Sequence, residues 1–392
     1  MKLNYIDMMK RSLIICALMM TAAAASAQVY YPDNVNPDMT RYTERHEPCR
    51  KEIMIPSSLN GYNIYKADLH THSIFSDGLV HPKMRVYEAW QDGLDVIAIT
   101  EHIENRAYES MFHEYMKGYT DKEYQKGPAG LKNVDINFSV REARKEAVKY
   151  GLTVISGSEI TRSGAGVGHF NALFTTDNNL IYHEDPVQSM RNAKAQGALV
   201  MHNHPGWRRK DINMTPTEKI AYSEGLIDGV EVMNGGMFFP GIIDRVREYN
   251  QFIAANTDVH KTTASDYRQT GADRPMTLIL AKDKSQESLR EALVQRRTIA
   301  FGFNTLCGSE DLLRDFFNAC VKVTRINETS VLLTNTTSIT FKLQQGKGRI
   351  INFDPFTSIV AGVNKESGTV SYRVINMWTG VDSHPVVELK AE

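Results

Sequence analysis

Short apolar runs alternate with amphipathic segments along residues 55–305, and this alternation is the main structural signal in the sequence. Seven runs are predicted strands: Tyr65–His70, Asp95–Thr100, Leu152–Ser156, His169–Phe174, Ala198–His202, Gly229–Met233 and Phe252–Asn256. The stretches between them have helical periodicity, and several end at a glycine, as helix C-termini often do. A repeated strand–helix unit predicts a barrel-like α/β fold of parallel strands. Barrels usually have eight strands, but this pattern yields seven.

The pattern changes after Arg297. Asp311–Ala319 is a predicted short helix, and the runs that follow it are short, alternating and separated by Asn, Gly and Thr. Such spacing is typical of an antiparallel β-sandwich. We therefore expect a barrel over residues 55–305 and a small Ig-like β-sandwich over residues 306–392. Because this second domain has no His or acidic cluster, its expected role is structural support, sugar or surface contact, or dimerisation.

The first 27 residues have the layout of a secretory signal peptide. Basic residues precede an apolar run over Ser12–Ala25, and Ala25-Ser26-Ala27 is a small-residue cleavage pattern. This run is too short to span a bilayer comfortably. We expect a secreted, periplasmic protein with no membrane span after cleavage, in which residues 28–54 form an extended leading segment.

One insertion interrupts the barrel pattern. Asn105–Asn137 is longer than an ordinary barrel loop and is dense in Tyr and Lys. Loops of this length are often functional lids, although a surface decoration explains the composition equally well. The sequence leaves both interpretations open.

Charge and cysteine content narrow the possible partners. The formal net charge is -1, so no strong positive field attracts bulk nucleic acid. After loss of Cys16, three cysteines remain in an oxidising compartment, and Cys307 with Cys320 is the expected pair if a disulfide forms. None of them has the spacing of a zinc site.

The most specific chemical signal is the segment Asp68–Gly78, which reads DLHTHSIFSDG. Residues two apart on a strand share a face, so His70 and His72 are expected to point together and to bind one divalent ion. Asp77 follows at a turn. A lone His-x-His pair is more often an ordinary surface or core pair, so the remaining clusters decide the interpretation.

Similar clusters follow at the ends of later predicted strands. They comprise Glu101 with His102, Glu159, His202 with His204, and Asp258 with His260, while His169 opens a strand after a Gly-rich turn. Barrel enzymes build their sites from strand C-termini. Of the 12 histidines in the chain, seven occupy these positions, which favours one shared metal site over scattered structural histidines.

These motifs, together with GSEI, GHFNAL, LVMHNHPG and NTDVH, resemble those of PHP-domain (polymerase and histidinol phosphatase) metallophosphoesterases over about residues 55–303. The stretch EGLIDGVEVMNGG and the β-rich tail are similar to exported phosphodiesterases of the Sb-PDE type. The resemblance implies a distorted (β/α)7 TIM-like barrel, which agrees with the strand count.

The resemblance also implies three metal positions. His70, His72, Glu159 and Asp258 are expected to hold the first ion, and Glu159 to bridge to a second ion completed by His169 and His204. Asp77, His102 and His260 are expected to hold the third. Family members contain two or three ions, and Asp77 stands where some members have His. The donor set suits Zn, Mn and Fe alike.

Such a site suits phosphoester hydrolysis, because ions about 3.5–4 Å apart can share a hydroxide and direct it at phosphorus. His202 or His260 is the candidate general acid for the leaving group. The candidate substrate contacts are Arg162, Trp207, Arg208 and Lys261. Arg208 lies in a basic stretch with Arg209 and Lys210, for which a solvated loop is the competing interpretation.

The expected function is metal-dependent hydrolysis of small organic phosphodiesters. A phosphomonoesterase of the same family is the first alternative. An amidohydrolase-like C–N hydrolase is the second, although no Lys stands at a strand end to bridge its metals. A non-catalytic surface or glycan-binding protein is the third. The sequence does not determine the oligomeric state.

Overall fold

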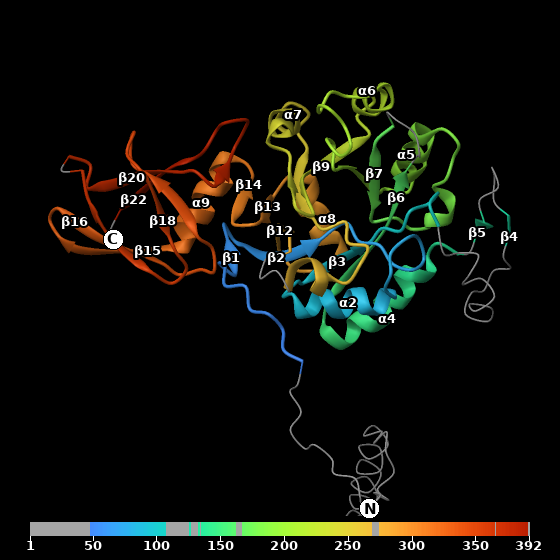
Figure 1. The fold of residues 1–392 in the computed structure, drawn as a ribbon, viewed down its shortest axis with the longest axis horizontal. Helices are drawn as coiled ribbons and strands as arrows, with labels where there is room; N and C mark the ends of the chain where they lie inside the picture. Colours follow the sequence, from blue (N-terminus) through green and yellow to red (C-terminus); the bar gives the residue numbers. More distant parts are fainter. Residues whose placement is uncertain are drawn as a thin grey trace, which may run out of the picture. The chain divides into compact units, whose positions relative to one another are not determined.

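The computed structural model describes residues 48–106, 125–126, 132–133, 135–161, 167–268, 274–364 and 366–390. The predicted signal peptide, most of the leading segment 28–54, most of the 105–137 insertion and Arg162 lie outside the described residues. Residues 49–392 belong to one compact unit. The fold is of the α/β class, and one large curled sheet organises it (Figure 1).

Each of the seven predicted runs coincides with a strand of this sheet. These strands are β2 (Tyr62–Asp68), β3 (Val96–Ile99), β6 (Thr153–Thr161), β7 (His169–Leu173), β8 (Leu199–Asn203), β9 (Ile227–Asn234) and β11 (Phe252–Asn256). β2, β3 and β6 are parallel neighbours, and so are β8, β9 and β11. A parallel bridge between Thr71 and Val259 brings the end of β11 beside the end of β2. The ends of these strands therefore face one another across a curled sheet.

The expectation that all of these strands are parallel is wrong for β7. β7 runs antiparallel to both β6 and β8, and His169 is paired with Thr161. Residues 162–168 are too few for the helical crossover of about a dozen residues that a parallel connection needs. The chain therefore turns back as a hairpin, and the first residue of β7 lies at the same edge of the sheet as the last residue of β6.

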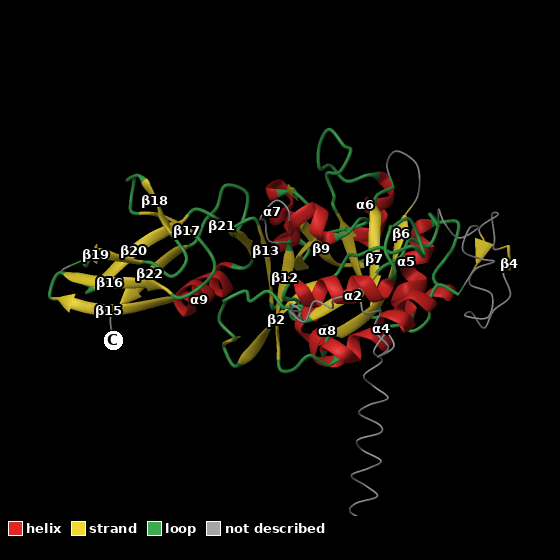
Figure 2. Cartoon of the chain, turned by 60° about the horizontal axis from the view of Figure 1, so that its bottom comes forward, coloured by secondary structure: helices red, strands yellow, loops and turns green. Residues whose placement is uncertain are grey.

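Helices lie around the outside of the curled sheet (Figures 1 and 2). They are α2 (Pro82–Gln91), α4 (Phe138–Tyr150), α5 (Pro186–Ala195), α6 (Pro216–Ser223), α7 (Ile243–Glu248) and α8 (Gln286–Val294). Both α5 and α6 begin with a proline directly after a capping residue, Asp185 and Thr215, whose side chains accept backbone N–H groups. Proline at the first helical position and a capping oxygen before it are the usual signals that start a helix.

Beyond β2 the sheet continues with antiparallel strands. They are β12 (Met276–Ala281), β13 (Thr298–Gly302) and β14 (Thr305–Cys307). The last neighbour, β21 (Met377–Trp378), comes from near the end of the chain and pairs with β14 in parallel. Two short strands, β1 (Ser58–Leu59) and β10 (Met237–Phe238), add to β2 and β9.

The tail of the chain forms two further antiparallel sheets. The predicted helix is confirmed as α9 (Glu310–Cys320). One sheet contains β15 (Val321–Asn327), β16 (Ser330–Asn335) and β19 (Ser358–Gly362), and the other contains β17 (Phe341–Gln344), β18 (Ile350–Phe353), β20 (Thr369–Val374) and β22 (Val386–Lys390). One hydrophobic cluster runs from the large sheet through α9 into the tail sheets, for example from Ile97 through Phe316 to Phe341. The expected boundary at residue 305 falls inside β14.

The expected Cys307–Cys320 disulfide is wrong. Both thiols are free and buried, and they belong to different hydrophobic clusters. Burial raises the pKa of each thiol above its usual range, which makes both unreactive. Cys49 is free and exposed.

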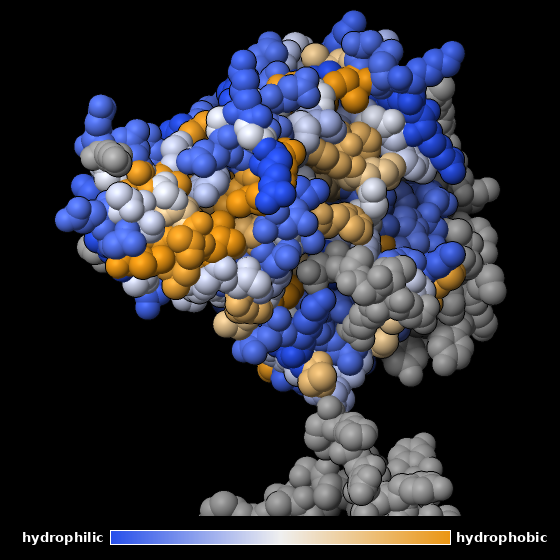
Figure 3. All heavy atoms as spheres, turned by 60° about the vertical axis from the view of Figure 1, so that its left-hand side comes forward, coloured by the Kyte–Doolittle hydropathy of each residue, from blue (hydrophilic) through white to orange (hydrophobic). Residues whose placement is uncertain are grey.

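Two surface features complete the description. Within the part of the chain described here, no helix has the length and apolar character needed to cross a bilayer. Figure 3 shows apolar surface on the side of the molecule that carries the tail sheets, where Ile326, Phe356 and Val360 are exposed.

Candidate metal centre

The first group of candidate ligands forms where β2 ends. The Nε2 atoms of His70 and His72 lie 3.1 Å apart. Asp258, which follows β11, places Oδ1 3.2 Å from His70 Nε2 and 3.1 Å from His72 Nε2. Three donor atoms from two neighbouring strand ends therefore converge on one point.

The second group forms at the β6–β7 hairpin. Glu159 Oε1 lies 3.2 Å from His169 Nδ1 and 3.8 Å from His204 Nε2. The antiparallel course of β7 brings His169 to the same edge as Glu159, because the two strands form a hairpin. His204 Nε2 also lies 3.6 Å from Asp258 Oδ2, so the second group adjoins the first.

The third group surrounds Asp77. Its carboxylate lies 3.4 Å from His102 Nε2 and 3.1 Å from His260 Nε2. The ring of His72 stacks between these two imidazoles, with both centroid distances at 4.4 Å. His72 therefore has access to two groups, which the sequence did not indicate.

The spacing of these atoms fits divalent metal ions. With ligand bonds of about 2.0–2.2 Å, neighbouring ligand atoms of a tetrahedral site lie about 3.4 Å apart. Two buried carboxylate oxygens in the cluster, Glu159 Oε2 and Asp77 Oδ1, make no hydrogen bond and face histidine ring nitrogens, at 2.8 Å from His102 Nδ1 and 3.1 Å from His260 Nε2. Buried carboxylate oxygens need a positive charge or a hydrogen-bond donor beside them, and a metal cation can supply that charge. The donor set is therefore suited to bind metal ions.

Hydrogen bonds fix the orientation of three of the imidazoles. Nδ1 of His70 lies 2.9 Å from Glu231, Nδ1 of His102 lies 2.8 Å from Thr161 Oγ1, and Nδ1 of His260 lies 2.7 Å from the Asp258 carbonyl oxygen. Each contact leaves Nε2 facing the cluster. This arrangement is usual for histidines that bind a metal through the other ring nitrogen.

Glu231 is a functional residue that the sequence analysis missed. It is fully buried and accepts hydrogen bonds from the His204 backbone N–H at 2.9 Å and from Asn234 and Asn256 at 2.8 Å. A single carboxylate thus connects His70 of the first group with His204 of the second. A lone acid within the apolar strand GVEVM was the signal available in the sequence, because buried acids are rare without a partner.

Glu101 supports the loop between the first and third groups. Its carboxylate accepts hydrogen bonds from the Ser73 backbone N–H at 3.1 Å, from the Ser73 hydroxyl, and from the Ser76 hydroxyl at 2.5 Å. The loop that carries Asp77 is therefore fixed to the end of β3. Glu101 is not among the grouped ligands.

The electrostatics of the cluster hold its carboxylates in the ionised form. Burial raises the pKa of Glu159, but His102 and His70 outweigh it and hold this pKa well below the usual range. In the same way, His70 and His72 hold the pKa of Asp258 below its usual range. Burial lowers the pKa of His102, whereas Glu159 and Asp77 raise it to about 10. Both carboxylates are therefore ionised at neutral pH, in the form that binds metal ions.

His202 does not join the cluster. Its ring is buried against Phe170, its Nδ1 lies 3.0 Å from the Tyr222 hydroxyl, and its Nε2 lies 3.0 Å from Glu218 Oε1. The expectation that His202 and His204 share a face is wrong, because the chain leaves the strand at His204, which has φ +26°. This position does not support His202 as the general acid.

Two of the predicted substrate contacts lie beside the second group. The Trp207 ring centroid is 5.6 Å from that of His169 and 5.3 Å from that of His204. The Arg208 guanidinium lies 4.3 Å above the Trp207 ring. Lys261 follows His260, and its carbonyl oxygen accepts a hydrogen bond from Arg85.

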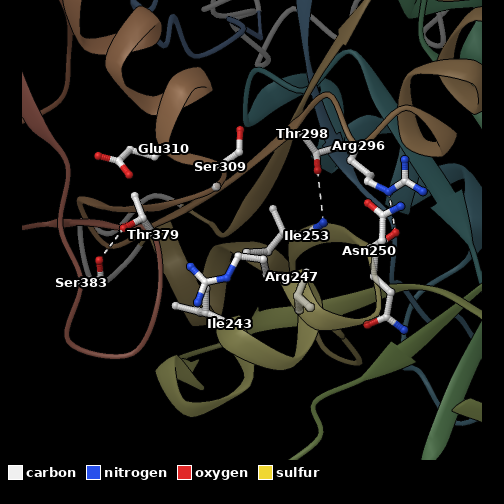
Figure 4. A pocket seen from close by; sticks show the side chains of 13 residues that line it. Ile243, Arg247, Asn250, Ile253, Arg296, Thr298, Ser309, Glu310, Thr379 and Ser383 are labelled. Atoms are coloured by element: carbon white, nitrogen blue, oxygen red, sulfur yellow. Dashed lines mark hydrogen bonds between the residues drawn. The ribbon is translucent and has the colours of Figure 1, made fainter.

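A separate cavity of about 350 Å³ lies between α7 and the start of α9 (Figure 4). Arg247, Arg296, Ser309 and Glu310 are among its lining residues. None of the grouped histidines or carboxylates lines this cavity. The metal centre and the cavity are thus distinct features.

The curled α/β sheet with His and carboxylate groups at its strand ends defines a metallohydrolase-like centre. Residues 68–274 match the PHP domain, and the chain belongs to this family. It is similar to a two-domain protein containing a predicted PHP-like metal-dependent phosphoesterase from Bacteroides vulgatus, whose crystal structure has a TM-score of 0.76 and 35% identity. This match covers 88% of the present chain and 99% of the other.

More distant similarities carry no argument about function. A lesion-specific endonuclease from Pyrococcus furiosus has 15% identity and a TM-score of 0.39, with 63% of this chain and 59% of that chain covered. A putative metal-dependent phosphoesterase from Bifidobacterium adolescentis has 13% identity and a TM-score of 0.37, with 62% and 98% covered. No curated protein sequence matches the chain.

Proposed function

We propose that the protein is a metal-dependent phosphoester hydrolase that acts on small organic phosphodiesters. The observation that carries this proposal is the convergence of nine donor residues into three groups, each spaced for a cation. Family membership and the similarity to the Bacteroides protein agree with it. The preference for diesters and the likeness to Sb-PDE-type enzymes rest on the sequence resemblance.

Each group has a distinct role in this proposal. The first, His70, His72 and Asp258, and the second, Glu159, His169 and His204, adjoin through Glu159 and Asp258. The third contains Asp77, His102 and His260 together with His72, which it shares with the first. Two or three divalent ions, of Zn, Mn or Fe, would activate water and neutralise charge on the phosphoryl oxygens when bound. The protein contributes fixed donors and an ionised, buried environment.

Several residues are placed to contact the substrate. Arg208 extends its guanidinium over Trp207 at the edge of the second group, where it can donate to phosphate oxygens. We propose Lys261 as a second phosphate contact on the side of the third group, and we propose Arg162 as a further phosphate contact from the sequence alone. His260 is the remaining candidate general acid, because its side chain is 36% exposed and its Nε2 faces Asp77.

Further parts of the proposal concern the whole chain. We propose that the seven strands β2, β3, β6, β7, β8, β9 and β11 form a distorted barrel, and that the tail sheets form an Ig-like β-sandwich. The shared hydrophobic cluster of the two tail sheets supports the latter. Export to the periplasm rests on the N-terminal sequence alone.

The test is hydrolysis of bis-p-nitrophenyl phosphate by the purified full chain with Mn, Zn or Fe added. We expect His204→Ala to abolish most of the activity, because His204 belongs to the second group. The matched control is His183→Ala, since His183 is exposed and outside the groups. Inactivity of the wild-type protein at confirmed metal content would contradict the proposal. Faster turnover of p-nitrophenyl phosphate would replace the diesterase by a monoesterase.

A further inference from the structure

The segment Pro205–Asn213, here called the 205–213 loop, forms one wall of the metal centre. It carries Trp207, which is 38% exposed and lies against His169 and His204, and Arg208, which lies over the Trp207 ring. An exposed aromatic ring and an adjacent guanidinium can bind an organic ester group and a phosphate oxygen. Their positions depend on what holds the loop.

The loop is anchored by an ion pair on the side away from solvent. Arg209 donates to both carboxylate oxygens of Glu218, with Nη1 3.0 Å from Oε2. The Glu218 side chain is fully buried, whereas that of Arg209 is 21% exposed. Bidentate Arg–carboxylate pairs fix both distance and orientation. The neighbour of Arg208 is thereby fixed to the first turn of α6.

Glu218 is itself held rigidly. It is the third residue of α6 and forms a capping box with Thr215, in which each side chain accepts the backbone N–H of the other residue. The capping box fixes the carboxylate relative to the helix axis. The anchor is therefore a property of the α6 N-terminus and does not depend on the loop.

The same carboxylate contacts the segments that carry both histidines of the second group. Its Oε1 lies 3.0 Å from Nε2 of His202, two residues before His204. A Cβ atom at Gly168, directly before His169, would lie 2.6 Å from this oxygen. Gly168 has φ +86°, a conformation that favours glycine. Glu218 thus lies behind β7, β8 and the 205–213 loop together.

We propose that Glu218 is a positioning residue that, through Arg209, fixes Trp207 and Arg208 for binding of the organic ester group. This inference rests on the proposed hydrolase function and deepens it. Arg209 is then a structural residue and not one of the phosphate contacts of the basic stretch. The position of Trp207 favours a diester with an aromatic or similarly flat ester group as substrate, because its ring provides the contact surface.

The expected effect of losing the anchor is weaker binding without loss of chemistry. Glu218→Gln keeps the size of the side chain but removes the charge that pairs with Arg209. We expect KM for bis-p-nitrophenyl phosphate to rise about tenfold with kcat nearly unchanged, as for a lost contact that acts equally on substrate and transition state. For methyl p-nitrophenyl phosphate the rise should be smaller, since one aromatic group is missing. Metal content should not change.

The matched control is Lys219→Gln, which removes a charge from the next residue of α6, where the side chain is exposed. Arg209→Ala is the second variant, because its partly exposed side chain can be removed even if Glu218→Gln does not fold. Trp207→Ala completes a double-mutant cycle with Arg209→Ala. If Arg209 acts through Trp207 and Arg208, the effects of Arg209→Ala and Trp207→Ala should be less than additive.

Hydrogen exchange of residues 205–213 tests the anchor without any substrate. We expect faster exchange in Glu218→Gln and Arg209→Ala than in the wild type and in Lys219→Gln. Equal exchange in all four proteins would overturn the inference, as would fully additive effects in the cycle. If the wild type hydrolyses no phosphoester, the proposed function fails, and the exchange measurement alone still decides whether Glu218 holds the loop.

Discussion

Replacing Glu231 by Gln tests whether one buried carboxylate holds two ligand groups in place. Glu231 Oε1 faces His70 Nδ1 at 2.9 Å and Asn256 Nδ2 at 2.8 Å, while Oε2 accepts from the His204 N–H and from Asn234. The amide of Gln offers one oxygen and one NH2 group. Its NH2 group faces either the His204 N–H and Asn234, which are both donors, or Asn256 and the Nδ1 of His70, which donates or accepts according to its tautomer.

The expected loss of stability follows from the number of buried donors left without a partner. A buried donor without a partner costs about 1–3 kcal/mol, so one or two of them lower the free energy of unfolding by about 1–6 kcal/mol. Without these contacts, His70 and His204 are no longer held in their orientations. Metal binding should weaken by about 10–100-fold, as is usual when a residue that supports a ligand is lost. Both effects share one cause, because His70 and His204 contact the same side chain.

The assay is a competition titration of metal against a chromophoric chelator, combined with urea unfolding of the metal-free protein. The control is Asp228→Asn on the same strand, whose side chain is 25% exposed and pairs with Lys194 at 2.7 Å. Asn keeps the size of the side chain and one oxygen for the Val200 backbone N–H, which Asp228 Oδ2 accepts at 2.7 Å, so this variant should bind metal normally. If Glu231→Gln binds metal as tightly as the wild type, Glu231 does not orient the ligands and our reasoning about the centre is refuted.

Three further predictions concern the metal ions and the core. Treatment with EDTA should abolish activity and lower the melting temperature, and added metal should restore both, because ligand at 100 times Kd stabilises by about 2.7 kcal/mol. Gly229→Ala should destabilise by about 1–3 kcal/mol, since its Cβ would lie 2.2 Å from the Phe252 ring, whereas Gly236→Ala meets nothing within 4 Å and serves as the control. Arg274→Met should destabilise by about 3–5 kcal/mol in urea unfolding, because it leaves two buried aspartates without their shared cation. Unchanged unfolding midpoints would contradict the last two.

The sequence was sufficient to predict seven strands of the large sheet and the clustered ligands, but not β12, β13 and β14 of the same sheet. His70, His72 and Asp258 end strands of a regular α/β pattern, and such ends meet at one edge of a sheet whatever the details of packing. The resemblance added the division into groups, and the structure brings the same residues together. That they bind metal stays a prediction until it is measured.

The errors have specific physical causes. The alternation rule that paired His202 with His204 holds only while the strand continues, and the positive φ at His204 ends it. The direction of β7 depends on the length of the connection from β6. The periodicity of hydrophobic residues along a strand gives no information about its direction. Glu231 was missed because the role of an acid within an apolar strand depends on its hydrogen-bond partners. These partners come from β2, β8 and β11. The predicted disulfide was wrong because the spacing of two cysteines in the sequence does not show which hydrophobic cluster each thiol belongs to.

The pairing of β21 with β14 affects the order in which the chain can fold during synthesis. Met377 and Trp378 complete the edge of a sheet whose first strand begins at residue 58. Until the ribosome has released them, β14 presents an unsatisfied row of peptide groups beside a largely finished enzyme. A nascent chain that stalls before residue 377 is therefore exposed to strand addition by other chains.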